Sequence, residues 1–293
     1  MSISFDGRVA IVTGAGGGLG REHALALAKR GAKVIVNDLG PGAEAVAQEI
    51  KAAGGEALAS IGSVTDFEAV QATVKLAMDT WGRVDILVNN AGILRDKSFT
   101  KMDLADFKLV VDVHLMGAVN CCKAVWDIMR DQKYGRIVNT TSSSGLFGNF
   151  GQSNYGAAKM ALVGLMQTLS IEGAKDNIKV NCLAPTAATA MTAGLLPPAV
   201  LEKLAPAAVT PGLLYLVSED APSRVILNAG AGTFARSYVT MTMGVHIGTG
   251  ADADDQVAAQ FEAISDRDKE LVPQSGSEQG LNEVGKAMAV SQS

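Results

Sequence analysis

Short apolar runs alternate with amphipathic stretches from the start of the chain to residue 235. Apolar, β-branched runs of this length predict buried parallel strands. Residues 22–30 carry Ala24, Leu25 and Ala28 at helical spacing, and Gly31 follows as a C-terminal cap. The alternation predicts α/β architecture with one domain, a doubly wound parallel sheet with helices on both faces. The predicted strands are residues 8–12, 33–37, 84–88 and 179–184, with a further strand ending near Ile61.

Two longer stretches, residues 103–132 and 155–173, predict helices with apolar residues on more than one face. Such helices indicate either subunit contacts in a homotetramer or a broad core within one subunit. After residue 235 the pattern changes: residues 240–250 predict a strand or hairpin, and residues 253–265 predict an amphipathic helix. Polar residues dominate from Val272 onward and predict partial disorder. The chain thus divides into a domain of residues 1–235 and a C-terminal extension of residues 236–293.

A glycine-rich segment, Thr13 to Gly20, follows the first predicted strand and leads into the first predicted helix. In this order of elements, backbone N–H groups and a helix N-terminus face a pyrophosphate. The spacing assigns that role to Gly14, Gly18 and Gly20; a tight turn made of small residues is the alternative. Asp38 ends the next predicted strand, and a carboxylate there would bind the adenosine ribose and repel a 2′-phosphate. The pattern therefore favours NAD over NADP as the cofactor.

Three polar side chains further along the chain have complementary chemistry. Tyr155 and Lys159 are four residues apart, so they share one face of a helix, and Ser142 lies thirteen residues before the tyrosine. An ammonium beside a phenol lowers the pKa of the phenol, so that tyrosine can exchange a proton with an alcohol or carbonyl oxygen. Ser142 would hydrogen-bond that oxygen. Because the same pair also occurs in ordinary amphipathic helices, it is the upstream glycine segment that favours hydride transfer.

These motifs together resemble the short-chain dehydrogenases/reductases over nearly the whole first 235 residues. The resemblance implies a Rossmann-like, NAD-dependent oxidoreductase acting on CH–OH groups. It implies that Tyr155 is the catalytic acid/base, Ser142 the ligand of the substrate oxygen, and Lys159 the partner of the tyrosine and a donor to the nicotinamide ribose. The cofactor-binding residues that it implies are Gly14, Gly18, Leu19, Gly20, Asp38, Ser63, Val64, Asn90, Ala91, Gly92, Tyr155, Lys159, Pro185 and Thr189.

The chain departs from the family pattern at three places. His114 stands where many members have an asparagine whose backbone carbonyl belongs to a proton relay; it is either a catalytic residue or a core histidine. Gly62 and Ser63 stand where many members have an aspartate near the adenine. Thr186 follows Pro185 in place of glycine, and Thr189 lies four residues after the proline.

Within the family, the strings 36–40, 90–99, 134–137 and 148–152 are similar to the (3R)-hydroxyacyl-CoA dehydrogenase domains of peroxisomal multifunctional enzymes, which are also described as 17β-hydroxysteroid dehydrogenases. The resemblance implies a (3R)-hydroxyacyl-CoA substrate and a mobile lid at residues 187–210. The lid is apolar and offers only Lys203 to the phosphates of CoA, so a hydroxysteroid or other alicyclic alcohol is the alternative substrate. A dinucleotide-sensing protein without catalysis is less favoured, because it would need only the glycine segment.

Composition indicates a compact enzyme, since 48% of the residues are hydrophobic. The net charge of −5 and the absence of a basic stripe argue against nucleic acid as a partner. We expect no membrane partner, because no apolar stretch reaches the ~20 residues of a membrane span. We expect cytoplasmic localisation, since neither a signal sequence nor a C-terminal peroxisomal address is recognisable. Cys121, Cys122 and Cys182 lack disulfide or metal spacing, and the three histidines are too scattered for a metal site.

Overall fold

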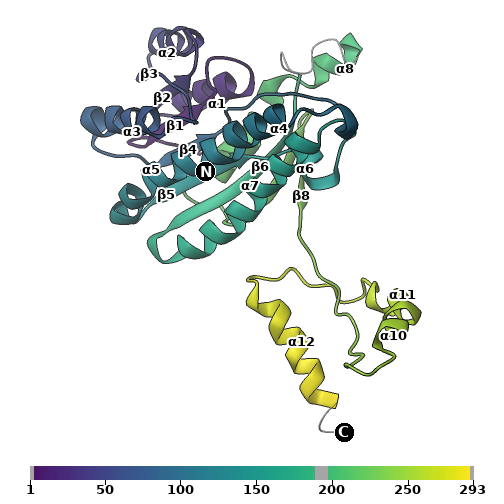
Figure 1. Cartoon of the computed structure of the whole chain (residues 1–293). Coiled ribbons are helices and arrows are strands. Elements are labelled where there is room, and N and C mark those ends of the chain that lie inside the picture. The colour runs from purple at the N-terminus through teal and green to yellow at the C-terminus, as the bar shows by residue number, and fades with distance from the viewer. Residues whose placement is uncertain (1–2, 189–196, 291–293) are drawn as a thin grey trace. The chain divides into compact units, whose positions relative to one another are not determined.

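The computed structural model describes residues 3–188 and 197–290. The chain forms two compact units, residues 1–236 and 237–293. The first unit contains an eight-stranded sheet in the order β3-β2-β1-β4-β5-β6-β7-β8, in which strands β1 to β7 pair in parallel (Figure 1). The strands are β1 (Val9–Thr13), β2 (Lys33–Asp38), β3 (Ala57–Ile61), β4 (Ile86–Asn89), β5 (Gly135–Thr140), β6 (Ile178–Thr186), β7 (Ile226–Gly230) and β8 (Thr233–Ser237).

The order of the strands reverses between β1 and β4. From β1 the chain proceeds outward through β2 and β3, then returns to place β4 on the other side of β1. Loops at the carboxyl ends of β1 and β4 therefore diverge and leave a crevice, which is where open parallel sheets bind ligands. All five residues of β1 are buried, as the continuous apolar run predicts.

Helices cover both faces of the sheet (Figure 1). One core cluster lies between the sheet and α1 (Gly18–Lys29), α2 (Gly42–Ala52) and α9 (Thr210–Leu216). A second lies between the opposite face and α3 (Phe67–Trp81), α5 (Gly117–Gln132) and α7 (Ser153–Glu172). The predicted doubly wound α/β fold is therefore confirmed. The shorter helical segments are η1 (Phe99–Lys101), α4 (Leu104–Val111), η2 (Asp112–Met116), α6 (Ser143–Phe147), η3 (Ala174–Asp176), α8 (Pro198–Lys203) and η4 (Pro206–Ala208).

Several boundaries differ from the sequence-based prediction. The first helix begins at Gly18 instead of residue 22, because the end of the glycine segment forms its first turn. The predicted helix 103–132 consists of α4 and α5 joined by a π-helical turn, η2, which contains His114. Strand β6 continues through Pro185 to Thr186, since a proline is tolerated where its missing N–H is not needed by the ladder.

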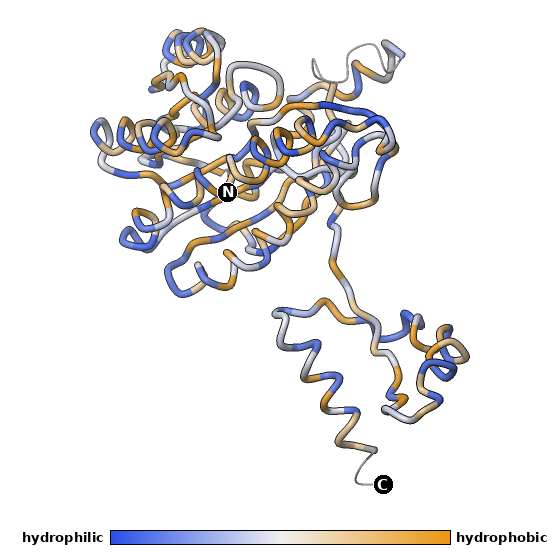
Figure 2. Tube along the Cα trace, in the orientation of Figure 1, coloured by the Kyte–Doolittle hydropathy of each residue, from blue (hydrophilic) through white to orange (hydrophobic). Residues whose placement is uncertain are grey.

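The second unit differs more from the prediction. In place of a strand or hairpin at 240–250, the described residues form a single bridge between Met241 and Leu271. The helix expected at 253–265 is interrupted at Gln260 and forms α10 (Ala253–Ala259) and α11 (Phe261–Ile264). Helix α12 (Ser277–Val290) occupies the segment for which disorder was predicted. Its hydrophobic residues recur among polar ones at helical spacing, so the periodicity outweighs the polar composition (Figure 2).

The stretch Leu104–Gln132 is long and apolar enough, by length and composition, to cross a membrane. The sequence-based statement that no stretch approaches this length was therefore wrong. Core helices pass the same test, and Cys121, Val125 and Met129 of this stretch are buried in the core cluster beneath α5. The stretch is weak support for a membrane span.

Candidate active site and dinucleotide cradle

The glycine segment forms a tight turn between β1 and α1. Gly14 and Gly18 have φ values of +62° and +53°, a region that glycine enters without strain. A Cβ on Gly14 would lie 2.7 Å from the Cα of Ala91, and one on Gly20 would lie 2.2 Å from the carbonyl oxygen of Gly14. Gly20 is thus required for packing of α1 against the turn, whereas Gly14, Gly17 and Gly18 face the open crevice.

Asn90 connects this turn to the loop after β4. Its side-chain amide donates to the carbonyl oxygens of Thr13 and Gly14, both at 3.0 Å. In return, the Thr13 hydroxyl oxygen accepts hydrogen bonds from the backbone N–H groups of Asn90 and Ala91, both at 3.1 Å. These four bonds hold the two loops of the crevice in one arrangement. Asn90 therefore braces the site in addition to lining it.

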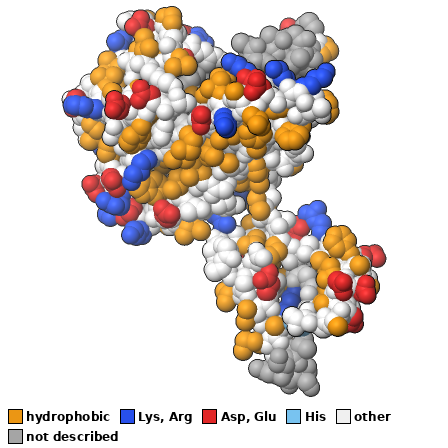
Figure 3. All heavy atoms as spheres, in the orientation of Figure 1, with side chains coloured by type: hydrophobic (Ala, Val, Ile, Leu, Met, Phe, Trp, Pro, Cys, Tyr) orange, Lys and Arg blue, Asp and Glu red, His pale blue; other side chains and the backbone are white. Residues whose placement is uncertain are grey.

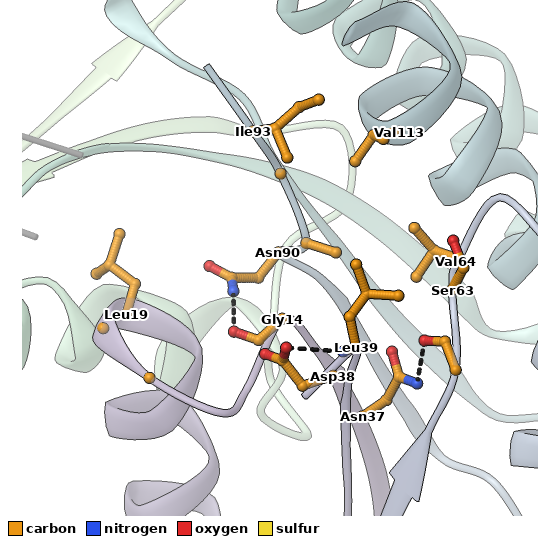
Figure 4. A pocket seen from close by; sticks show the side chains of 15 residues that line it. Gly14, Leu19, Asn37, Asp38, Leu39, Ser63, Val64, Asn90, Ile93 and Val113 are labelled. Carbon is orange, nitrogen blue, oxygen red and sulfur yellow. Dashed lines mark hydrogen bonds between the residues drawn. The ribbon is translucent and has the colours of Figure 1, made fainter. Parts of the chain in front are cut away.

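A cavity of about 340 Å³ lies in the crevice at the ends of β1, β2, β3 and β4 (Figure 4). Nine of the predicted cofactor residues line it: Gly14, Gly18, Leu19, Asp38, Ser63, Val64, Asn90, Ala91 and Gly92. Sequence reasoning missed six others, most of them neighbours of the predicted residues or of His114: Gly17, Asn37, Leu39, Gly62, Ile93 and Val113. Five of the missed residues sit at strand ends or in the following loops, where the ends of adjacent parallel strands would have been the signal; Val113 lies in the π-helical turn η2.

Asp38 lies at the edge of the cavity, where Figure 4 shows it beside Leu39 and Gly14. One carboxylate oxygen accepts from the N–H of Gly16 at 2.9 Å, and the other accepts from the N–H of Leu39 at 2.7 Å. These bonds orient the carboxylate and leave lone pairs for further donors. Asp38 is charged, and the described residues that line the cavity include no lysine or arginine.

On the far wall, the loop after β3 carries Ser63 and Val64. The Ser63 hydroxyl is hydrogen-bonded to that of Thr65 at 2.7 Å and accepts from the N–H of Thr65, so this side chain is engaged within its own loop. Val64 is largely buried and presents an apolar surface, while its carbonyl accepts from the amide of Asn120 at 2.9 Å. The wall is therefore apolar and suits a flat aromatic base.

Ser142, Tyr155 and Lys159 come together beside the carboxyl end of β5. Ser142 caps α6, its hydroxyl accepting from the N–H of Ser144 at 3.1 Å, and its interaction with the Tyr155 phenol acts to lower the pKa of that phenol. The Lys159 ammonium lies 5.5 Å from the centre of the Tyr155 ring and donates to the carbonyl of Thr140 at 2.5 Å. The folded chain thus places the predicted hydroxyl, phenol and ammonium in one cluster.

The pKa of the phenol departs from the expectation. Burial raises the pKa of Tyr155, the hydrogen bond with Ser142 opposes the rise, and the charge of Asp96 adds to it. Burial also lowers the pKa of Lys159 to about 7, so this side chain is only partly charged at neutral pH. The expected lowering of the phenol pKa by the lysine is therefore not met in the protein alone, because desolvation acts on both groups.

His114 is buried next to this cluster, and its ring meets that of Tyr155 edge to face at 5.1 Å. Burial, together with the charge of Lys159, lowers the pKa of His114 to about 3. Pro185 lies in β6 and does not line the cavity. Thr189 and residues 189–196 of the predicted lid lie outside the described residues.

The three cysteines are free and buried. Burial raises the pKa of Cys122 to about 12 and raises the pKa values of Cys121 and Cys182, so these thiols stay protonated. Within residues 3–188 and 197–290, no group of three histidine, cysteine or acidic side chains could hold a metal ion.

A doubly wound sheet with a glycine cradle at its switch point and a serine–tyrosine–lysine cluster beside it defines a dinucleotide-dependent oxidoreductase. The family model described as short chain dehydrogenase matches residues 8–197, and the chain belongs to this family of oxidoreductases acting on CH–OH groups. The resemblance stated from the sequence is thus confirmed.

The chain is similar to several larger proteins. It is 51% identical, over 246 residues, to the peroxisomal hydratase-dehydrogenase-epimerase of Saccharomyces cerevisiae, an alignment that covers 80% of this chain and 27% of the yeast protein. The structure of full-length peroxisomal multifunctional enzyme type 2 from Drosophila melanogaster superposes with a TM-score of 0.83 and 38% identity, covering 98% of this chain and 50% of that one. The chain thus spans about a quarter to a half of these two relatives.

A hydroxysteroid dehydrogenase is a second kind of relative. A 7α-hydroxysteroid dehydrogenase complexed with NADH and 7-oxo glycochenodeoxycholic acid superposes with a TM-score of 0.73 and 31% identity, covering 78% of this chain and 95% of that one.

Proposed function

We propose that the protein is an NAD-dependent dehydrogenase that interconverts a hydrophobic secondary alcohol and its ketone, with a (3R)-hydroxyacyl-CoA as the substrate. The observation that carries this proposal is one site with two parts. The first is a tight glycine turn, in which a Cβ on Gly14 or Gly20 would collide with neighbouring backbone, and the second is the Ser142–Tyr155–Lys159 cluster. Such a cradle fits a dinucleotide pyrophosphate, and the cluster fits proton exchange with an alcohol oxygen.

In the direction of oxidation, Ser142 donates a hydrogen bond to the alcohol oxygen and orients it. The Tyr155 phenolate accepts the hydroxyl proton as the C–H bond breaks; a bound nicotinamide cofactor would supply the hydride acceptor. In reduction the phenol returns the proton to the oxygen. Because burial raises the pKa of Tyr155, the phenolate needs nearby positive charge, which Lys159 supplies in part and oxidised nicotinamide would supplement.

The preference for NAD rests on Asp38. Its carboxylate is held at the edge of the cavity by the N–H groups of Gly16 and Leu39 and still has lone pairs for two ribose hydroxyls. A 2′-phosphate at the same place would meet this negative charge with no lysine or arginine among the described lining residues. The structure of the hydroxysteroid dehydrogenase with NADH supports the unphosphorylated cofactor by analogy.

Two observations favour a CoA ester. The yeast relative, 51% identical over 246 aligned residues, is named a peroxisomal hydratase-dehydrogenase-epimerase. In addition, Arg95 and Lys97 are half exposed in the loop after β4, and both share Asp106 at distances of 3.7 and 3.6 Å, longer than a hydrogen bond. The Asn154 amide, adjacent to Tyr155, donates to the Arg95 carbonyl at 3.0 Å, so the loop that carries these cations contacts the start of α7, and the cations can attract phosphate groups.

The second candidate substrate is a hydroxysteroid, favoured by the similarity to the 7α-hydroxysteroid dehydrogenase and by exposed Phe147 and Phe150 in the segment before Tyr155. A sensing protein is disfavoured, because binding alone would not require the Ser142–Tyr155–Lys159 cluster.

We also propose a homotetramer. Figure 3 shows hydrophobic side chains gathered over helices of the first unit. The exposed ones on α4, η2 and α7 include Leu109, Met116, Met160 and Ile171. A second subunit would cover these side chains, and sedimentation analysis should give four times the chain mass of 30.2 kDa; a monomer at micromolar concentration would contradict the assembly.

The deciding experiment follows NADH or NADPH formation with three substrates: a (3R)-hydroxyacyl-CoA, the same acyl group on pantetheine, and a panel of hydroxysteroids. We expect NAD-linked turnover of both thioesters, with a lower KM for the CoA ester because only it carries the adenosine phosphates. The (3S)-hydroxyacyl-CoA is the matched control for stereochemistry. Turnover of steroids with no turnover of thioesters would select the second candidate; NAD binding with no turnover of any alcohol would support sensing.

A further inference from the structure

The buried ring of His114 contacts both Tyr155 and the Gly92–Ile93 wall of the cofactor cavity. His114 lies in the π-helical turn η2, where the helix between α4 and α5 widens, and only 4% of the residue is exposed. π-helical turns are rare and often occur at functional sites. The turn packs against α7, which carries Tyr155, and its residue Val113 lines the cofactor cavity.

On one side, the ring lies against Gly92 and Ile93. The Nε2 atom of His114 is 2.8 Å from the carbonyl oxygen of Ile93 and 3.1 Å from the backbone nitrogen of the same residue. A Cβ on Gly92 would lie 2.2 Å from Cε1 of the imidazole, so only glycine lets the ring approach this closely. Both Gly92 and Ile93 line the cavity. The imidazole therefore supports the wall that the cofactor would touch.

On the other side, the ring meets the phenol. The two ring centres are 5.1 Å apart at an interplanar angle of 88°, an edge-to-face contact that is favourable between aromatic rings. Tyr155 comes from α7 and Ile93 from the loop after β4, so no shared secondary structure fixes their spacing. The His114 ring contacts both, and the bond from the Asn154 amide to the Arg95 carbonyl joins the same two segments farther along the loop.

The protonation state of the ring argues against a role in moving protons. Burial and the charge of Lys159 lower the pKa of His114 to about 3, so the imidazole is uncharged at neutral pH. In an uncharged imidazole, Nε2 either donates to the Ile93 carbonyl or accepts from the Ile93 N–H, and the shorter distance favours donation. The Nδ1 atom is buried without a hydrogen-bond partner among the described residues.

We propose that His114 is a positioning residue, whose ring spaces the Tyr155 phenol against the Gly92–Ile93 wall of the cofactor cavity. The inference rests on the proposed function, because it assigns His114 to the geometry of that same site. The ring makes two contacts with different effects. The bond to Ile93 supports cofactor binding, and the edge contact with Tyr155 sets the environment, and so the pKa, of the phenol.

Two variants divide these contacts. His114→Phe keeps a ring against Tyr155 and loses the bond to Ile93, so we expect the dissociation constant of NAD to rise about tenfold, equivalent to about 1.4 kcal/mol. His114→Gln keeps a hydrogen-bonding group and loses the ring, so we expect NAD binding within about twofold of the wild type while kcat falls about tenfold and the pKa of Tyr155 shifts. NAD binding is followed by fluorescence, and the phenol is titrated by near-ultraviolet absorbance against matching Tyr155→Phe proteins.

His23→Phe is the matched control. His23 is also a buried histidine with a pKa lowered to about 3, and it is hydrogen-bonded to Thr210 at 3.0 Å on the opposite face of the sheet. We expect this variant to lower the melting temperature without changing NAD affinity or the Tyr155 titration. If both His114 variants behave like this control, the positioning role is refuted.

A loss of kcat by more than about a hundredfold in both His114 variants, with NAD binding intact, would instead indicate direct proton transfer and would also overturn the proposal. NAD binding and the Tyr155 titration need no alcohol. An enzyme that binds NAD but rejects every hydroxyacyl-CoA would therefore contradict the proposed function and leave this test intact.

Discussion

Gly20→Ala tests whether the third glycine of the cradle acts through packing. The added Cβ would lie 2.2 Å from the carbonyl oxygen of Gly14 and 2.6 Å from the amide nitrogen of Asn90, both well inside the 3.4–4 Å range of ordinary contact. Both neighbours belong to the brace between the glycine turn and the loop after β4. Neither can move away without losing a hydrogen bond.

The cost follows from these contacts. Overpacking a close-packed interior costs ~1–3 kcal/mol. Loss of the two bonds from the Asn90 amide to Thr13 and Gly14 adds about 1 kcal/mol each. The expected destabilisation is therefore ~3–5 kcal/mol, or roughly 10 °C in melting temperature for a domain of this size.

Urea and thermal unfolding measure this change directly, and NAD binding is measured below the melting temperature. Gly17→Ala is the control, because a Cβ at Gly17 meets no atom within 4 Å and its φ of −172° suits any residue. The control should keep the stability of the wild type. A loss of less than about 1 kcal/mol in Gly20→Ala would refute the packing argument, since the overpacking range alone starts there.

Tyr155→Phe should retain NAD binding and lose turnover by at least about a hundredfold in a coupled NADH assay, because the proton acceptor is removed; substantial residual turnover would exclude Tyr155 as the acid/base. Asp38→Ala should raise the preference for NADP relative to NAD about tenfold, measured as the ratio of kcat/KM values, and an unchanged ratio would show that Asp38 does not select the cofactor. Stability should fall as the pH falls. The pKa values of His23 and His114 are lowered from 6.5 to about 3 in the folded protein, so below pH 6.5 the unfolded chain binds protons that the folded protein does not. The stability that the neutral histidines contribute is therefore lost as the pH falls from 6.5 toward 3. Together they should lower the unfolding free energy by ~3 kcal/mol per pH unit in that range, and His23→Gln should remove about half of the slope in urea titrations; an equal slope in this variant would contradict the assignment.

Much of the first unit could be predicted because its signals are local. The buried run in β1, the glycines that follow it and the acid that ends β2 each depend on neighbouring residues in the chain. The same holds for the spacing of Tyr155 and Lys159 on α7. Parallel strands buried on both faces and a turn that needs positive φ leave few residue types free, so these elements are recognisable in one sequence.

The second unit was harder to predict. Its helices are short and mostly exposed, so their stability depends on weak periodicity and on single contacts such as those of Asn282 and Lys286 with the Met243 carbonyl. A polar composition indicated disorder at α12, while Leu281, Val284 and Met288 recur along one face. Composition averages over positions, whereas a helix depends on their order.

The sequence by itself determined the fold class, the cradle and the identity of the three chemical groups. The tertiary structure alone decided how these groups meet: Asn90 braces two loops, Gly20 serves packing, and the His114 ring spaces Tyr155 from Ile93. It also decided their charge, since burial raises the pKa of Tyr155 and lowers that of Lys159. Spacing along a chain specifies which side chains share a face, but desolvation and contacts between distant segments exist only after the chain has folded.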